Sequence, residues 1–201
     1  MQFLILGPIE VRADGERVAL GSGHQETVLA MLLTDPNRVV PLHRLVEAAW
    51  DGDSPATARR QVQNTVSALR ARLARAGSPG TIVTDGPGYR AVIGHDELDA
   101  DVFESRVEAA HREAAAGRAA AAVDELRAAL DMWRGPALAG TPSQAVEAAV
   151  VRLNERRLAV LDEYVADIAE QTGYRRLGEH PREVLAQIAS RGAARSGHDT
   201  G

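Results

Sequence analysis

Residues 57–75 read TARRQVQNTVSALRARLAR, and the rest of the chain is interpreted outward from this stretch. On a helical wheel of about 100° per residue, four aliphatic side chains fall within about 60° of one another and form an apolar stripe. These side chains are Val62, Val66, Leu69 and Leu73. Just upstream, Ser54-Pro55-Ala56-Thr57 provides a capping residue and a Pro suited to a first helical turn. We therefore expect a helix from about Ala56 to Ala76, ended by the breaker Gly77-Ser78-Pro79-Gly80.

The face of this helix opposite the apolar stripe carries no carboxylate. It holds Thr57, Arg60, Asn64, Ser67, Ala68, Ala71 and Arg75, with Arg59, Gln63 and Arg70 on one flank and Gln61 and Arg72 on the other. Arg pairs with guanine, Asn and Gln pair with adenine, and small side chains allow close approach, so these residue types suit the major groove of DNA. An Arg-rich face alone is also typical of an ordinary solvated helix, and the neighbouring elements must decide between the two interpretations.

The residues before this helix predict a small sheet and two further helices. Phe3–Leu6, Ile9–Arg12 and Val18–Leu20 have the pattern of short strands, and Asp14-Gly15 is a hairpin turn signal. Helices are expected at Gln25–Leu33 and Leu42–Trp50, because each has its aliphatic side chains on one face.

The residues after the helix predict a β-hairpin. Thr81–Val83 and Tyr89–Ile93 read as strands around a Gly86-Pro87-Gly88 turn. A small antiparallel sheet, three helices and a C-terminal hairpin form the α+β winged-helix layout, in which the third helix enters the major groove. The wing, residues 85–90, would approach the adjacent DNA backbone, and Arg90 is its only cation. The sequence therefore predicts a partner in double-stranded DNA.

From Asp99 onward the pattern is purely helical, with segments expected at residues 102–116, 119–133 and 144–171. Two antiparallel helices over about 34 residues match the length of a tetratricopeptide-like unit. We expect a winged-helix domain at residues 1–94 and an all-α tetratricopeptide-like helical domain at residues 99–175. The tail at residues 190–201 lacks periodicity and is expected to be disordered.

Charge is divided unevenly along the chain. The net charge of −5 combines +1 over residues 1–94 with −6 over residues 95–201. Between Asp53 and Asp85 there are five Arg and no acid, and such a local basic stripe matters more to a phosphate backbone than the total does. The acidic helices of residues 95–175 are compatible with protein partners and equally with an ordinary solvated helical bundle.

Composition excludes several other classes of protein. The hydrophobic share of 45% and the charged share of 25% are those of a globular chain. The absence of Cys excludes disulfides and thiolate chemistry. No apolar run reaches the roughly 18 residues of a membrane span. Since the N-terminus also lacks the basic start of a signal peptide, we expect a cytoplasmic protein with no membrane contact.

No catalytic or metal site can be assembled from the sequence. The six His residues are scattered without zinc-ligand spacing, and no phosphate-binding loop or dinucleotide fingerprint occurs. Asp51 and Asp53 lie in a predicted turn, where Asp is common for conformational reasons. Ser22 has no paired acid or base. We therefore expect no enzyme activity, no catalytic residue, no metal and no cofactor.

A series of short motifs runs in order along residues 2–172. They are FLILGPIEV at 3–11, NRVV at 37–40, ATAR at 56–59, VSALR at 66–70, GY at 88–89, ELD at 97–99 with Phe103, and LDMWRGPAL at 130–138. Each motif is weak, but the ordered set resembles the Streptomyces antibiotic regulatory protein family of transcriptional activators. Members of that family join an OmpR-type winged helix to a bacterial transcriptional activator domain.

The resemblance implies a function, partners and a set of site residues. It implies a pathway-specific activator of an antibiotic or secondary-metabolite gene cluster that binds direct repeats near a promoter. Copies of the protein would bind side by side on the DNA, self-associate there and recruit RNA polymerase holoenzyme. By position, the DNA-contacting residues would be Thr57, Arg59, Arg60, Gln63, Asn64, Ser67 and Arg70, with Arg90 in the wing.

An alternative interpretation is a helical-repeat adaptor that binds another protein and binds DNA weakly or not at all. Ala68 and Ala71 favour it, because family members usually carry Arg near both positions. The resemblance also implies several helices beyond residue 172, so the helical domain is expected to be truncated. A salt-sensitive shift of promoter DNA would separate the two interpretations.

Overall fold

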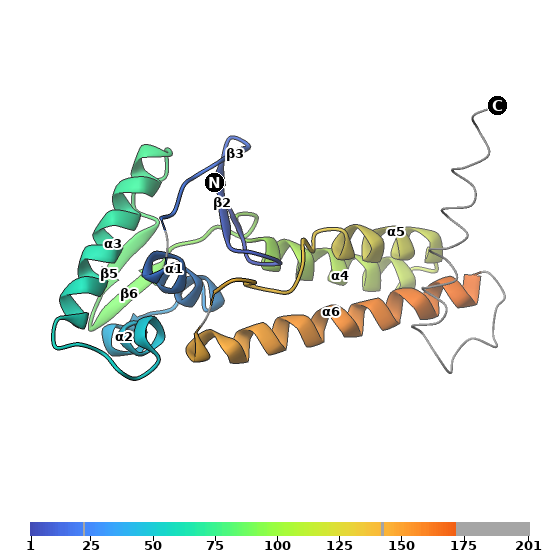
Figure 1. Ribbon diagram of the computed structural model, residues 1–201. Coiled ribbons are helices and arrows are strands. Elements are labelled where there is room, and N and C mark those ends of the chain that lie inside the picture. The colour runs from blue at the N-terminus through green and yellow to red at the C-terminus, as the bar shows by residue number, and fades with distance from the viewer. Residues whose placement is uncertain (22, 142, 172–201) are drawn as a thin grey trace, which may run out of the picture. The chain divides into compact units, whose positions relative to one another are not determined.

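A computed structural model describes residues 1–21, 23–141 and 143–171 of the chain (Figure 1). The strands are β1 Gln2–Leu4, β2 Glu10–Ala13, β3 Glu16–Arg17, β4 Val40–Pro41, β5 Ile82–Asp85 and β6 Gly88–Ala91. The helices are α1 His24–Thr34, α2 Leu42–Trp50, α3 Ala58–Arg75, α4 Asp99–Ala115, α5 Ala119–Leu130 and α6 Gln144–Gln171. The chain forms two compact units: one combines residues 1–105 with 131–156, and the other combines residues 106–130 with the described residues from 157 onward.

The first sheet is antiparallel, with the strand order β1-β2-β3. Phe3 lies opposite Val11, and both side chains are fully buried. The prediction of a strand at Val18–Leu20 is wrong, since the paired residues of β3 are Glu16 and Arg17. Only the Val18 amide still donates to this sheet, to the Val11 carbonyl at 2.8 Å. The chain leaves the sheet after this point, and Leu20 is buried in the core.

Three helices form the centre of the winged helix. The helix expected at Gln25–Leu33 is present as α1, but residues 27–33 are all buried, so the core encloses this helix on every side and not on one face only. The apolar stripe of α3 is confirmed as well, since all four of its predicted side chains are at most 1% exposed. The predicted start of α3 is wrong by two residues. Thr57 is its N-cap residue, while Ser54 and Pro55 belong to the preceding loop, where the Pro55 carbonyl accepts the Ala58 amide at 2.9 Å.

The predicted hairpin is present as β5 and β6, and it belongs to a larger sheet with the order β4-β6-β5. The two-residue strand β4 has no signal in the sequence, and it forms because Val40 pairs with Tyr89 and Pro41 with Gly88. A Cβ atom on Gly88 would lie 2.0 Å from the Val40 carbonyl oxygen, so this pairing requires a glycine. In Figure 1, α3 lies along the β5–β6 hairpin.

The start of the chain is anchored by residues far along the sequence. Asp99 at the N-terminus of α4 accepts the Ile5 amide at 2.8 Å and the Leu6 amide at 3.0 Å. The amides of Arg134 and Leu138 donate to the Leu6 and Ile5 carbonyls at 2.8 and 3.0 Å. Burial raises the pKa of the Asp99 carboxyl, although the two amides and the nearby Arg134 guanidinium act in the opposite direction.

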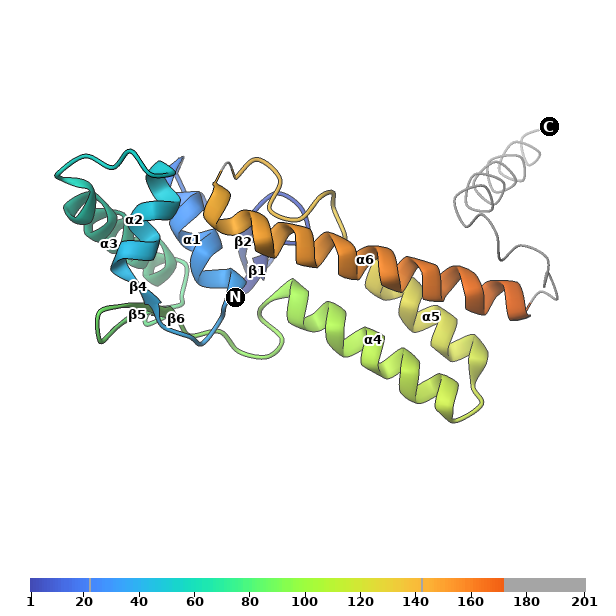
Figure 2. The ribbon, with the colours of Figure 1, turned by 90° about the horizontal axis from the view of Figure 1, so that it is seen from below.

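The second compact unit is entirely helical. The latter part of α4 lies beside α5, as Figure 2 shows, and Arg106 pairs with Glu125 at 3.0 Å. His111 contacts Glu163 of α6 at 2.8 Å. The buried hydrophobic residues of this second unit are Val107, Ala110, Ala122, Leu126, Ala129, Val160 and Val165.

The helical segments match their predicted ranges closely, and the predicted fold class is confirmed. The helix expected at 102–116 starts three residues earlier, at Asp99, and the one expected at 119–133 ends at Leu130. The predicted tail at 190–201 lies outside the described residues. Every helix among the described residues is too short or too polar to cross a lipid bilayer.

Candidate nucleic-acid interface

The polar face of α3 is open to solvent. Thr57, Arg59, Arg60, Gln63, Asn64 and Ser67 are all exposed, as expected from the wheel. Val62, Val66 and Leu69 hold the helix against the core from the opposite side. The burial of one stripe therefore fixes which side chains face outward, and six of the eight predicted site residues lie at one exposed surface.

Four of these side chains are available to a ligand. Within residues 1–21, 23–141 and 143–171, no hydrogen bond or ion pair engages the side chains of Arg59, Arg60, Gln63 or Asn64. Ser67 donates its hydroxyl to the Gln63 carbonyl at 2.9 Å, one helical turn back. The Thr57 hydroxyl accepts the Gln61 side-chain amide at 2.9 Å. The two hydroxyls are thus partly engaged, whereas the cations and amides are free to bind.

Arg70 has a different environment from the other Arg residues of α3. Its Nε donates to the Ile82 carbonyl at 2.7 Å, and its Nη2 donates to the Thr84 hydroxyl at 2.9 Å. The guanidinium carbon lies 5.4 Å from the centre of the Tyr89 ring. Arg70 is therefore half-buried between α3 and the hairpin, at the edge of the exposed face.

Arg90 lies in the wing, as predicted, but it has an acidic neighbour. Its Nε is 3.1 Å from a carboxylate oxygen of Asp85 on the paired strand, and its side chain is 36% exposed. An ion pair of this kind at a surface is weak, because water and salt screen both charges. Arg90 can thus exchange Asp85 for a phosphate, although the pair lowers the positive potential of the free wing.

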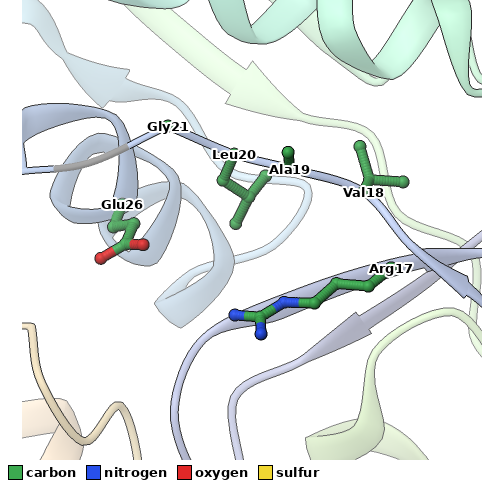
Figure 3. Close-up of a pocket in the computed structure, with 6 residues that line it drawn as sticks. All are labelled: Arg17, Val18, Ala19, Leu20, Gly21 and Glu26. Atoms are coloured by element: carbon green, nitrogen blue, oxygen red, sulfur yellow. The ribbon is translucent and has the colours of Figure 1, made fainter.

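The far end of α3 contributes two further cations, Arg72 from the flank of the polar face and Arg75 from the face itself. Arg72 donates to the Ala19 carbonyl at 3.0 Å, and Arg75 donates to the Ala71 carbonyl of its own helix at 3.0 Å. Next to Ala19 lies a pocket of about 470 Å³, which Figure 3 shows between the extended residues 17–21 and Glu26 of α1. None of the eight predicted site residues lines this pocket, so it is separate from the α3 surface.

Asp51, one of the two acidic residues in the predicted turn, has a structural partner. Asp51 accepts the Gln144 amide at 3.0 Å and so caps the N-terminus of α6. Across the described residues, no group of three or more His, Asp or Glu side chains is arranged to hold a metal ion.

Comparison with known proteins gives two family matches that follow one another along the chain. Residues 15–91 match the C-terminal domain of transcriptional regulatory proteins, and residues 98–190 match the bacterial transcriptional activator domain. The first match contains α3 and the wing, and the second contains the helical segments. The chain belongs to the Streptomyces antibiotic regulatory protein family.

Relatives of this family member are transcriptional regulators. It is 41% identical to the transcriptional regulatory protein MoaR1 of Mycobacterium tuberculosis over 141 residues, which are 69% of this chain and 45% of MoaR1. It is 34% identical to the regulatory protein AfsR of Streptomyces coelicolor over 200 residues, which are 92% of this chain and 20% of AfsR. The chain thus spans less than half the length of each of these curated relatives.

A solved structure supports the fold assignment. The structure of Mycobacterium tuberculosis EmbR in complex with a low affinity phosphopeptide superposes with a TM-score of 0.79 at 34% sequence identity. The match covers 83% of this chain and 45% of the EmbR chain. The winged helix followed by a helical domain is therefore an arrangement that this family member shares with a solved relative.

Sequence reasoning missed the partners of Arg70 and Arg90. Asp85 was visible as an acid near the wing, and the hairpin register that brings it to Arg90 could have indicated the pair. The contact between Arg70 and the Ile82 carbonyl cannot be predicted from the sequence, because every residue has a main-chain carbonyl that could accept the bond.

Proposed function

We propose that this chain is a sequence-specific DNA-binding transcriptional activator that inserts α3 into the major groove. The observation that carries this proposal is the exposed, carboxylate-free face of α3, on which Arg59, Arg60, Gln63 and Asn64 have no partner among the described residues. Free guanidinium and amide groups on one face of a helix are the groups that pair with guanine and adenine edges.

The residues of the face divide into two roles. Arg60, Gln63 and Asn64 lie where a docked helix meets base edges, and they would read sequence. Thr57 and Arg59 lie near the N-terminus of α3, where backbone amides and cations favour phosphates. Ser67 and Arg70 extend the contact along the helix, and Arg90 would reach the neighbouring backbone from the wing.

The family points to the biological setting of this binding. A regulator of an antibiotic or other secondary-metabolite gene cluster would bind promoter direct repeats as adjacent copies and recruit RNA polymerase. Support comes from the similarity to the regulatory protein AfsR of Streptomyces coelicolor. The net negative charge of residues 95–201 disfavours DNA contact there and is compatible with a protein partner. The protein would act by recruitment, and no reaction step is required of it.

Footprinting and gel shifts with DNA upstream of neighbouring biosynthetic genes test the proposal. R60A and N64A should each weaken the preferred site by about 1–3 kcal/mol and relax specificity at one position. R112A, which removes an exposed cation from α4, is the matched control and should bind like the original protein. Unchanged footprints for both α3 variants would refute the assignment.

The same experiment tests the adaptor interpretation. A phosphate-binding protein loses affinity steeply between two salt concentrations, because each neutralised phosphate contributes about 0.9 to the slope of log K against log salt. If no promoter fragment shows a salt-sensitive shift, the DNA-binding proposal fails, and the adaptor interpretation, in which the helical region binds another protein, is supported.

A further inference from the structure

A single side chain on α3 contacts both strands of the wing hairpin. Thr84 lies two residues after Ile82 in β5, and the Arg70 guanidinium donates to both of these residues at 2.9 and 2.7 Å. Thr84 pairs with Tyr89 of β6, and the same guanidinium lies 5.4 Å from the centre of that ring. The planar group thus bridges α3, β5 and β6 at one point.

Other contacts hold the hairpin from the opposite side. β6 pairs with β4 through Val40 and Pro41, and the Asn37 amide, just before β4, donates to the Ala91 carbonyl at 2.9 Å. On the side of α3 the attachment is sparser. Among the described residues, two hydrogen bonds join α3 to residues 82–91, and Arg70 donates both of them. The hairpin therefore depends on this one side chain for its polar attachment to the helix.

The chemistry of the contact requires a guanidinium. The Nε and Nη2 atoms of Arg lie in one plane at a fixed separation, so they can donate to two acceptors at once. A Lys ammonium carries the same charge but has no planar pair of donors, and its bonds are not directed in the same way. Charged donors also form stronger hydrogen bonds than neutral ones.

We infer that Arg70 is a positioning residue that fixes the wing relative to α3 and so sets whether Arg90 can contact DNA while α3 occupies the groove. This inference rests on the proposed DNA binding. Arg70 still has Nη1 for a phosphate, but its main contribution is made through the hairpin.

The first test uses the free protein and requires no DNA. Amide hydrogen exchange at residues 82–91 should accelerate roughly threefold or more in R70A, because the local opening of the hairpin becomes easier. R70K should accelerate exchange to a similar extent, since it keeps the charge but loses the paired donors. R75A is the matched control: it removes a cation from the same helix whose bond is to its own backbone, and it should leave wing exchange unchanged.

The second test measures coupling on promoter DNA. In the original protein, R90A should weaken DNA binding about tenfold. In the R70A background the same change should weaken binding at most about twofold, because a displaced wing no longer brings residue 90 to the DNA. The loss of DNA affinity caused by R90A should be reduced in the R70K background as much as in the R70A background. A residue that only stabilised the fold would lower the unfolding midpoint without producing this selective coupling to residue 90.

Two results would overturn the inference. One is unchanged wing exchange in both R70A and R70K. The other is strict additivity of R70A and R90A, which would mean that the two Arg residues contact DNA independently. If the original protein shows no DNA binding at all, the proposed function fails, and the exchange measurement still decides whether Arg70 holds the wing.

Discussion

Asp99 shows how one buried carboxyl links distant parts of the chain. It accepts two backbone amides near the N-terminus, and burial raises its pKa above the ordinary value of 3.8. Between 3.8 and the raised pKa, the folded state binds more protons than the unfolded state. The free energy of unfolding should therefore fall as pH rises through this window, because the buried carboxylate must become charged.

The pH dependence of Asp99 can be isolated by substitution. D99N cannot titrate, so denaturant titrations across acidic pH should show the original protein losing stability relative to D99N as pH rises from about 3.8. D96N, at a fully solvent-exposed carboxyl, serves as the control and should follow the original protein. A constant difference between D99N and the original protein at every pH would contradict this expectation.

Ala71 offers a gain of function at the residue scale. It is exposed on α3, in a stretch without acidic residues. A71R should add one phosphate contact, steepen the salt dependence of binding by about 0.9 and tighten the complex at low salt. Gel shifts at several salt concentrations measure both effects.

A gain cannot be explained by misfolding, which makes this variant a strict test of the docking face. The comparison variant is A114R on α4, an exposed position outside the winged helix where the substitution adds the same charge. If A114R tightens binding as much as A71R does, the effect reflects net charge alone and the docking face is elsewhere.

At the scale of elements, sequence periodicity predicted most of the fold. The four-residue stripe of α3 was predictable because burial of one face imposes a helical period on aliphatic residues, whereas residues 27–33 of α1 are all buried and carry no such period. β4 was not predictable, because two residues cannot show a period and their pairing depends on β6 from elsewhere in the chain. The exposed site residues followed from the same stripe, whereas the bridging role of Arg70 depended on a tertiary contact with a carbonyl group.

The β4–β6 pairing gives a prediction for the wing sheet. A Cβ atom on Gly88 would lie 2.0 Å from the Val40 oxygen and 2.8 Å from the Pro41 Cα, both in the backbone. G88A should therefore separate β4 from β6 and destabilise the protein by roughly 2 kcal/mol or more, since no side-chain movement can relieve the clash. Thermal or denaturant unfolding measures the loss.

Gly86 provides the control for this substitution. It lies in the turn between β5 and β6, and a Cβ atom there would meet nothing within 4 Å, although its φ of +52° makes Ala somewhat strained. G86A should cost only about 1 kcal/mol, the usual penalty for a left-handed Ala. The φ of Gly88 lies outside the left-handed region, so a loss in G88A no larger than that in G86A would show that the approach of β4 does not require a glycine at position 88.

At the scale of the whole molecule, the winged helix does not complete its core with its own residues. The compact unit that contains it also takes in residues 99–105 and 131–156. Its hydrophobic cluster includes Leu98, Leu138 and Val146, and Phe103 contacts Trp133 edge to face at 5.6 Å between ring centres. The activator region therefore supplies part of the structure that holds β1 in place.

This shared packing predicts the behaviour of an isolated winged helix. A fragment of residues 1–94 would leave the Ile5 and Leu6 amides without Asp99 and would expose the surface that Leu138 covers. Buried amides without partners cost about 1–3 kcal/mol each, so the fragment should unfold several kcal/mol more easily than the full chain. L138A in the full chain removes only the apolar contact and should fall between the two, with a loss of about 2–5 kcal/mol. Urea unfolding followed by circular dichroism ranks the three, and an equal midpoint for the fragment and the full chain would show that the winged helix is stable without residues 99–156.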